Sequence, residues 1–297
     1  MPRLHVIVAS AFVALAAVAP ALAEGSSKST GTSTSTSSNN QGNRSGAPSR
    51  STLPSSAITA SSIASPFAWI DDGRVLEPAT VSVSVSTLHW QGNNVSEVDA
   101  PVTSVAAGVA PRVQAGAIVP NIIGSSDPAG AVGGLGSTYF YGKIALLGVG
   151  EESPLKLAVA PTIEVLSDAA ALSLVATESR VQFGVPVGFE FDAGSTRIFA
   201  GAGFFTRGVR FAGGGVAAQA SQKLMISASL SHSWTTTDAL GTVADRTELT
   251  GTAAYMLAPH ISVFGSISQT LATTDQDGAG TTISGGLSVL LRPFHLK

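Results

Sequence analysis

A histidine beside a serine is the pairing in this sequence that comes closest to catalytic chemistry. A serine hydroxyl becomes a nucleophile when a histidine takes its proton and an acidic group orients that histidine. His232 and Ser233 are adjacent, but the sequence positions no acidic partner, and the alternation puts His232 on the same side as Leu230 and Trp234. An interfacial histidine is therefore favoured over a catalytic one, and we expect no enzyme activity.

The motifs that could hold a metal or a phosphate are incomplete. Asp275-Gln276-Asp277-Gly278 is similar to the beginning of a calcium loop, but the later glutamate of such a loop is missing. The glycine-rich residues 133–136 and 213–215 lack the lysine and the strand-to-helix context of a phosphate loop. We therefore expect no metal and no cofactor.

Composition narrows the class of protein. Charged residues make up 12% of the 297 residues, against roughly 25% in an ordinary soluble domain. The net charge is -3 and no basic cluster appears, so nucleic acid is not an expected partner. Because the chain has no cysteine, disulfides cannot hold it together, and closing a sheet into a barrel is the economical way to stabilise an exported chain.

The N-terminal part divides into three segments before the fold begins. Residues 1–23 have the basic start, short apolar run and small final residues of a secretory signal peptide. Residues 24–65 are rich in Ser, Thr, Gly and Asn, which predicts a disordered linker. Residues 66–76 are more apolar, and a periplasmic lead-in is favoured there over a plug inside a barrel. We expect the folded domain over residues 77–297.

In that domain, apolar and polar residues alternate with a period of two, which is the pattern of β-strands. Val81, Val83 and Val85 alternate with serines in the first run, and about twelve such runs in all extend to the C-terminus. The clearest other runs cover residues 155–165, 181–191, 224–231, 261–268 and 282–291.

Alternation by itself also fits a soluble β-sandwich, but four features favour a closed antiparallel transmembrane barrel. Many runs reach the ~9–11 residues of a tilted spanning strand. Their polar face is mainly Ser, Thr, Gly and Ala rather than charged. Short turns alternate with long loops, and aromatic residues gather at strand ends, as in outer-membrane barrels. Both termini are then expected in the periplasm.

The same alternation assigns residues to the two faces of the wall. The larger polar residues expected to line the lumen are Gln114, Lys143, Lys156, Glu164, Gln182, Glu190 and Arg197. The aromatic residues expected in the membrane interface are Phe140, Phe189, Phe191, Phe204, Phe211, Trp234 and Tyr255. Because the lumen charges have both signs, we expect weak ion selectivity, although an ion-pair network that only stiffens the wall fits equally well.

The central part of the domain resembles a known family. Residues 134–143, Gly-Leu-Gly-Ser-Thr-Tyr-Phe-Tyr-Gly-Lys, followed by Leu-Lys-Leu-Ala-Val-Ala-Pro-Thr at 155–162, look like the transporter-type barrels of a family linked to phenol-degradation pathways. The resemblance implies an outer-membrane barrel and a hydrophobic or aromatic solute. The last strand is similar to the assembly signal of bacterial barrels at Ser284, Gly286, Val289 and Leu291, which implies the barrel-assembly machinery as a partner.

These observations together predict a bacterial outer-membrane barrel, in contact with membrane lipid, that passes small molecules by facilitated diffusion. Two other functions stay open. One is a lipid-modifying enzyme centred on His232 and Ser233, and the other is a structural or adhesive barrel without conductance.

Overall fold

The computed structural model describes residues 73–93, 96–126, 133–149, 153–166, 179–206, 209–235, 245–274 and 279–292. All of them belong to the unit Arg50–Lys297. The expected signal peptide and linker, and residues 66–72 of the expected lead-in, lie outside these ranges.

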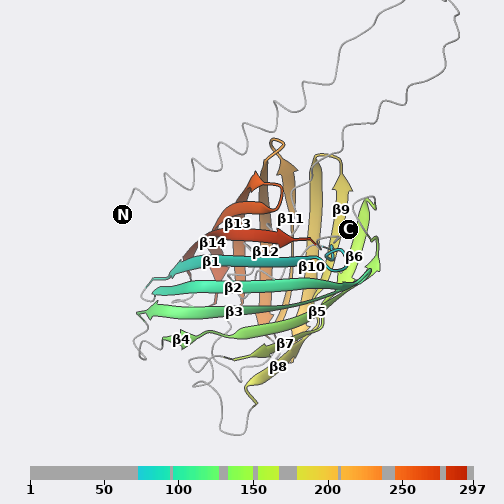
Figure 1. The fold of residues 1–297 in the computed structure, drawn as a ribbon. Coiled ribbons are helices and arrows are strands. Elements are labelled where there is room, and N and C mark those ends of the chain that lie inside the picture. Colours follow the sequence, from blue (N-terminus) through green and yellow to red (C-terminus); the bar gives the residue numbers. More distant parts are fainter. Residues whose placement is uncertain are drawn as a thin grey trace, which may run out of the picture. The chain divides into compact units, whose positions relative to one another are not determined.

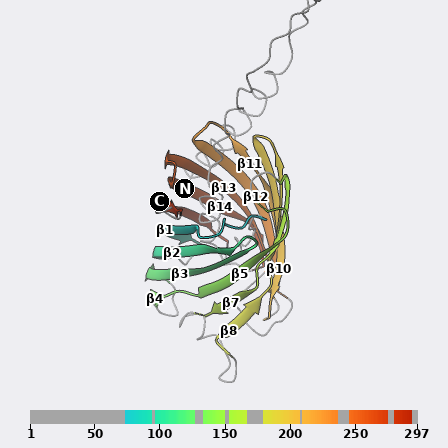
Figure 2. The same cartoon turned by 45° about the vertical axis from the view of Figure 1, so that its right-hand side comes forward.

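The described residues form one closed antiparallel β-barrel (Figures 1 and 2). The strands are β1 (Val81–Gln91), β2 (Ser96–Ala110), β3 (Val113–Ser125), β4 (Gly134–Leu135), β5 (Thr138–Leu147), β6 (Leu155–Val159), β7 (Thr162–Val165), β8 (Val181–Gly184), β9 (Val187–Ala193), β10 (Thr196–Phe205), β11 (Val209–Gln219), β12 (Leu224–Thr235), β13 (Arg246–Ala258), β14 (Ile261–Thr273) and β15 (Thr281–Leu291).

Apart from β4–β5, β6–β7 and β8–β9, each strand pairs with the next one along the chain, and β1 pairs with β15, which closes the ring. Of the fifteen segments, β4 is a two-residue extension beside β3, while β6 with β7 and β8 with β9 are two halves of single wall strands. The wall therefore has twelve strands, which confirms the expected fold class.

Two runs that the sequence predicts as continuous strands are each broken at a proline. Pro161 separates β6 from β7, and Pro186 separates β8 from β9. Proline has no N–H to give to the ladder, so regular pairing stops there. The carbonyls of both prolines still accept bonds from neighbouring strands, Gly142 N to Pro161 O at 3.0 Å and Ala160 N to Pro186 O at 2.8 Å, and the wall stays closed.

The two ends of the barrel differ in their connections. At one end, two-residue turns at 111–112, 194–195 and 259–260 join the strands, together with the connections 148–154 and 220–223. We call this the turn end, and the opposite end the loop end. At the loop end, the connections 126–133, 166–180, 236–245 and 274–280 have seven or more residues each, whereas 92–95 and 206–208 are short.

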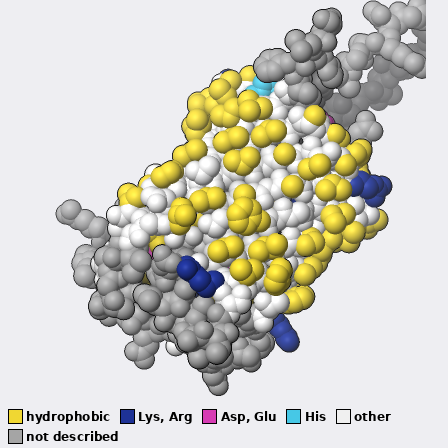
Figure 3. Space-filling view, turned by 60° about the horizontal axis from the view of Figure 1, so that its bottom comes forward, with side chains coloured by type: hydrophobic (Ala, Val, Ile, Leu, Met, Phe, Trp, Pro, Cys, Tyr) yellow, Lys and Arg dark blue, Asp and Glu magenta, His cyan; other side chains and the backbone are white. Residues whose placement is uncertain are grey.

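The wall is polar inside and apolar outside. In β1, Ser82, Ser84 and Ser86 are buried, while Val85 is exposed. Exposed Leu, Ile, Val and Phe side chains recur on the outward positions of the other strands, and Figure 3 shows them spread over one face of the barrel with Lys and Arg near its margins. A water-soluble barrel would have the opposite arrangement. Within the described ranges, no helix is long and apolar enough to cross a membrane.

Candidate solute pathway and its charged cluster

The seven polar residues expected in the lumen come from adjacent wall strands, β3 to β10. Six of them are buried and Glu164 is partly buried, while their neighbours along each strand are more exposed. In a wall one layer thick, that pattern puts these side chains on the inner side. The inner positions from β11 to β15 and in β1 carry mostly Ser, Thr, Gly and Ala, apart from the Arg246–Glu248 ion pair of β13, so most of the inner charges lie on the β3 to β10 side of the barrel.

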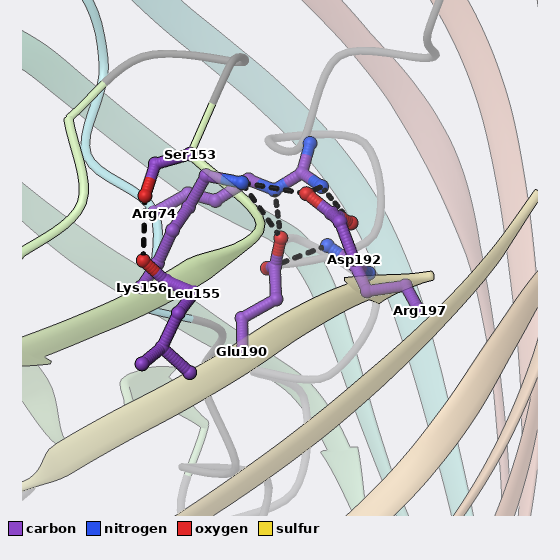
Figure 4. A network of polar contacts seen from close by, with 7 residues as sticks. All are labelled: Arg74, Ser153, Leu155, Lys156, Glu190, Asp192 and Arg197. Carbon is purple, nitrogen blue, oxygen red and sulfur yellow. Dashed lines mark hydrogen bonds and ion pairs between the residues drawn. The ribbon is translucent and has the colours of Figure 1, made fainter. Parts of the chain in front are cut away.

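Three of the seven residues meet in a cluster at the turn end (Figure 4). The Glu190 side chain is 0% exposed, and one of its oxygens lies 3.2 Å from Nη1 of Arg197. Its other oxygen lies 3.5 Å from Nζ of Lys156, a residue that is itself 3% exposed. Burying an ionised carboxylate is costly unless charged or hydrogen-bonding partners surround it, and Glu190 has cations on both sides.

Arg74 and Asp192 complete this charged cluster. Nη2 of Arg74 donates to both carboxylate oxygens of Asp192, at 2.8 and 2.9 Å, and Nε of Arg74 donates to Glu190. Nζ of Lys156 also donates to Asp192, at 2.6 Å. Two carboxylates and three cations therefore share one network that joins β6, β9, β10 and the residues before β1.

Neither residue is among those expected to line the lumen. The strand run expected over residues 181–191 ends just before Asp192, although Asp192 lies two positions beyond Glu190 and so shares its face, which is a signal present in the sequence. Nothing in the spacing around Arg74 indicates that it reaches a strand more than a hundred residues away.

Residues 73–80, which we call the strap, carry Arg74 to the far side of the ring. Between β1, which follows the strap, and β9, which Arg74 reaches, lie β2, β3, β5 and β6. The backbone N–H of Leu76 donates to Oε1 of Gln114 at 2.9 Å, and the N–H of Ala79 donates to the carbonyl of Gly108 at 2.8 Å. The strap is thus bonded to β3 and β2 on its way.

Other expected lumen residues lie outside the charged cluster. Gln114 stands opposite Lys143 in the register, and its amide donates to the Tyr141 hydroxyl at 3.4 Å. Glu164 accepts a hydrogen bond from the Tyr139 hydroxyl at 2.8 Å and stands opposite Gln182.

The barrel is similar in fold to outer-membrane channels of known structure. The NanC porin superposes with a TM-score of 0.51 at 10% identity, covering 70% of this chain and 98% of that one. An outer-membrane channel from Pseudomonas putida F1 superposes with a TM-score of 0.53 at 10% identity, covering 74% and 98%. The chain shares their fold. No family model matches the sequence, and no curated protein matches it.

Within this porin-like barrel, His232 and Ser233 point to opposite sides of the wall. Ser233 is buried on the inner side, whereas His232 is turned outward with Trp234, the two ring centroids 4.5 Å apart. Nδ1 of His232 lies 2.8 Å from the Thr247 hydroxyl. Neighbours on one strand cannot form a nucleophile and base pair across the wall, so the geometry gives the lipid-modifying alternative no catalytic pair at this position.

Six of the seven expected interfacial aromatic residues are exposed on the outer side, namely Phe140, Phe189, Phe191, Phe204, Trp234 and Tyr255. Their placement at a membrane interface stays a prediction. The assignment of Phe211 is wrong, because this residue is 4% exposed and lies inward. Its ring fills the space left by Gly203, where a Cβ would come within 2.7 Å of it, and it lies 6.4 Å from the ring of Phe205.

Among the described residues, no three acidic, histidine or cysteine side chains are close enough together to hold a metal ion. The incomplete calcium-loop motif at residues 275–278 lies outside the described residues.

Proposed function

We propose that this protein is a bacterial outer-membrane barrel that passes small solutes passively. The observation that carries the proposal is the inverted wall, with apolar side chains exposed outside and hydroxyl, glycine and charged residues inside. A lipid phase is the surroundings in which such an outer face is stable. The fold likeness to a porin and to an outer-membrane channel supports the same function.

The inner wall supports passive passage of small solutes. Its β11 to β15 side offers mainly hydroxyls and glycines besides the Arg246–Glu248 pair, and the charged cluster on the other side also joins both signs. Fixed charges of both signs give a pore little preference for cations or anions. We therefore propose a weakly selective channel, with the turn end and both termini in the periplasm, inserted by the barrel-assembly machinery.

The class of solute is a finer proposal. The family resemblance in the sequence implies a hydrophobic or aromatic molecule. An apolar strip on the inner wall supports that implication, because Met225 packs against Phe199 and Ala217 on one side and against Phe264 and Ala254 on the other. An aromatic solute has a surface to contact there that a purely polar pore lacks.

The function is tested by fractionation followed by conductance. We expect the protein in the outer-membrane fraction, with a faster gel mobility unboiled than boiled, and stepwise currents when the purified protein is added to a planar bilayer. Detergent without protein is the control. Recovery of the protein from the soluble fraction would contradict membrane residence, and a folded membrane barrel without current would favour the structural or adhesive alternative.

A further inference from the structure

An arginine stands on the outer wall at the loop end. Arg210 is the second residue of β11 and is exposed. In the register it lies opposite Phe204 of β10 and Trp234 of β12, and both of these rings are exposed as well. Three neighbouring strands therefore present a ring, a guanidinium and a ring at one level.

No carboxylate of the described residues forms an ion pair with Arg210, in contrast to Arg74, Arg197 and Arg246 on the inner side. A charge on the lipid-facing wall is costly at mid-membrane and costs little near the interface. The strand-end position of Arg210 fits the interface, where anionic head groups lie.

The surroundings of Arg210 are held in place by the wall itself. His232 lies on the same outer side, packs edge-on against Trp234 and is within hydrogen-bond distance of the Thr247 hydroxyl. We call Phe204, Arg210, His232, Trp234 and Thr247 the rim patch. It combines one planar cation with aromatic surfaces that sit well between lipid chains and head groups.

We propose that the rim patch binds the phosphate group of an anionic membrane lipid from outside the barrel. The guanidinium fork matches a phosphate with two parallel hydrogen bonds, and the rings of Phe204 and Trp234 contact the acyl chains on either side. This site rests on the proposed membrane location, but it does not depend on whether the lumen conducts.

The test compares wild type with Arg210→Gln and Arg210→Lys in detergent micelles. The probe is a phosphorylated glycolipid of the outer-leaflet type, and its dephosphorylated form is the comparison. Binding is measured by native mass spectrometry and by the rise in unfolding temperature. Arg112→Gln is the matched control, because Arg112 is also exposed but lies in a turn at the opposite end.

We expect wild type and Arg112→Gln to bind the phosphorylated lipid with the same affinity. Arg210→Gln should bind it about tenfold more weakly. Arg210→Lys should fall between them, since lysine keeps the charge but not the fork. Equal binding by Arg210→Gln, equal binding of the dephosphorylated lipid, or no binding by wild type would each overturn the site. If the protein binds the phosphorylated lipid but carries no current, the channel proposal fails and the lipid site stands. If the chain does not fold as a barrel in micelles, both proposals fail.

Discussion

At the scale of single residues, Glu190 is a buried carboxylate that depends on its charged neighbours. Its carboxylate is wholly buried and is contacted by Arg74, Lys156 and Arg197. Desolvating one carboxylate and several cations is costly, and the cost is offset only while every member keeps its partners. The cluster is therefore sensitive to the loss of any one charge.

Glu190→Gln should be strongly destabilising, because it leaves three cations around a single remaining carboxylate, that of Asp192. Breaking a buried ion pair by removing one partner costs about 3–5 kcal/mol. The free energy of unfolding can be followed by urea titration in detergent, with the unboiled gel band as readout. Glu77→Gln is the control, since Glu77 is exposed in the strap. If the two variants unfold at the same urea concentration, the cluster does not stabilise the barrel.

At the scale of elements, the segment before the first strand is part of the folded barrel, because the strap lies against the inner wall. Residues 66–76 are expected to be a lead-in, yet residues 73–76 lie against inner-wall residues, with Leu76 bonded to Gln114 and Arg74 to β9. Gly108 is essential to this path, because a Cβ there would overlap the carbonyl of Glu77. In the proposed channel, the strap therefore occupies space at the turn end.

Arg74→Gln should detach the end of the strap from β9. We expect a larger single-channel conductance than in wild type, and a loss of about 1.5–3 kcal/mol from the bonds to Asp192. A double-mutant cycle with Asp192→Asn measures the coupling, and Arg112→Gln controls for the loss of one arginine. Unchanged conductance together with zero coupling energy would show that the strap is not held by Arg74.

At the scale of the whole molecule, the apolar outer face determines whether the barrel is stable in lipid or in water. Leu230 lies near the middle of β12 and is 50% exposed, and Leu257 lies near the turn end of β13 and is 52% exposed. The two residues match in type and exposure but differ in height along the wall. They form a pair for testing what surrounds the barrel.

Leu230→Lys should lower the free energy of unfolding by roughly 2–4 kcal/mol in a bilayer, and Leu257→Lys by only about 0–1 kcal/mol, because a charge costs most at mid-membrane. Urea unfolding in lipid vesicles measures both variants. In a protein surrounded by water, the two substitutions would have similar and small effects, and that result would contradict the transmembrane assignment.

Much of this architecture follows from the sequence by itself. The period-two alternation is a local property, because successive side chains of any strand point to opposite faces, and it is enough to put Lys156, Glu190 and Arg197 each on the polar face of its own strand and Leu230 on the apolar face of its strand. Turn residues and the number of runs then indicate twelve strands and closure.

The tertiary structure decided what depends on contacts between distant segments. It brought Arg74 and Asp192 to Glu190, broke two strands at Pro161 and Pro186, and turned Phe211 inward over Gly203. Alternation fixes only which residues of one strand share a face. Which face points inward, and which residues meet, depend on the register between strands and on the path of the strap, and these are set by packing and pairing across the whole barrel.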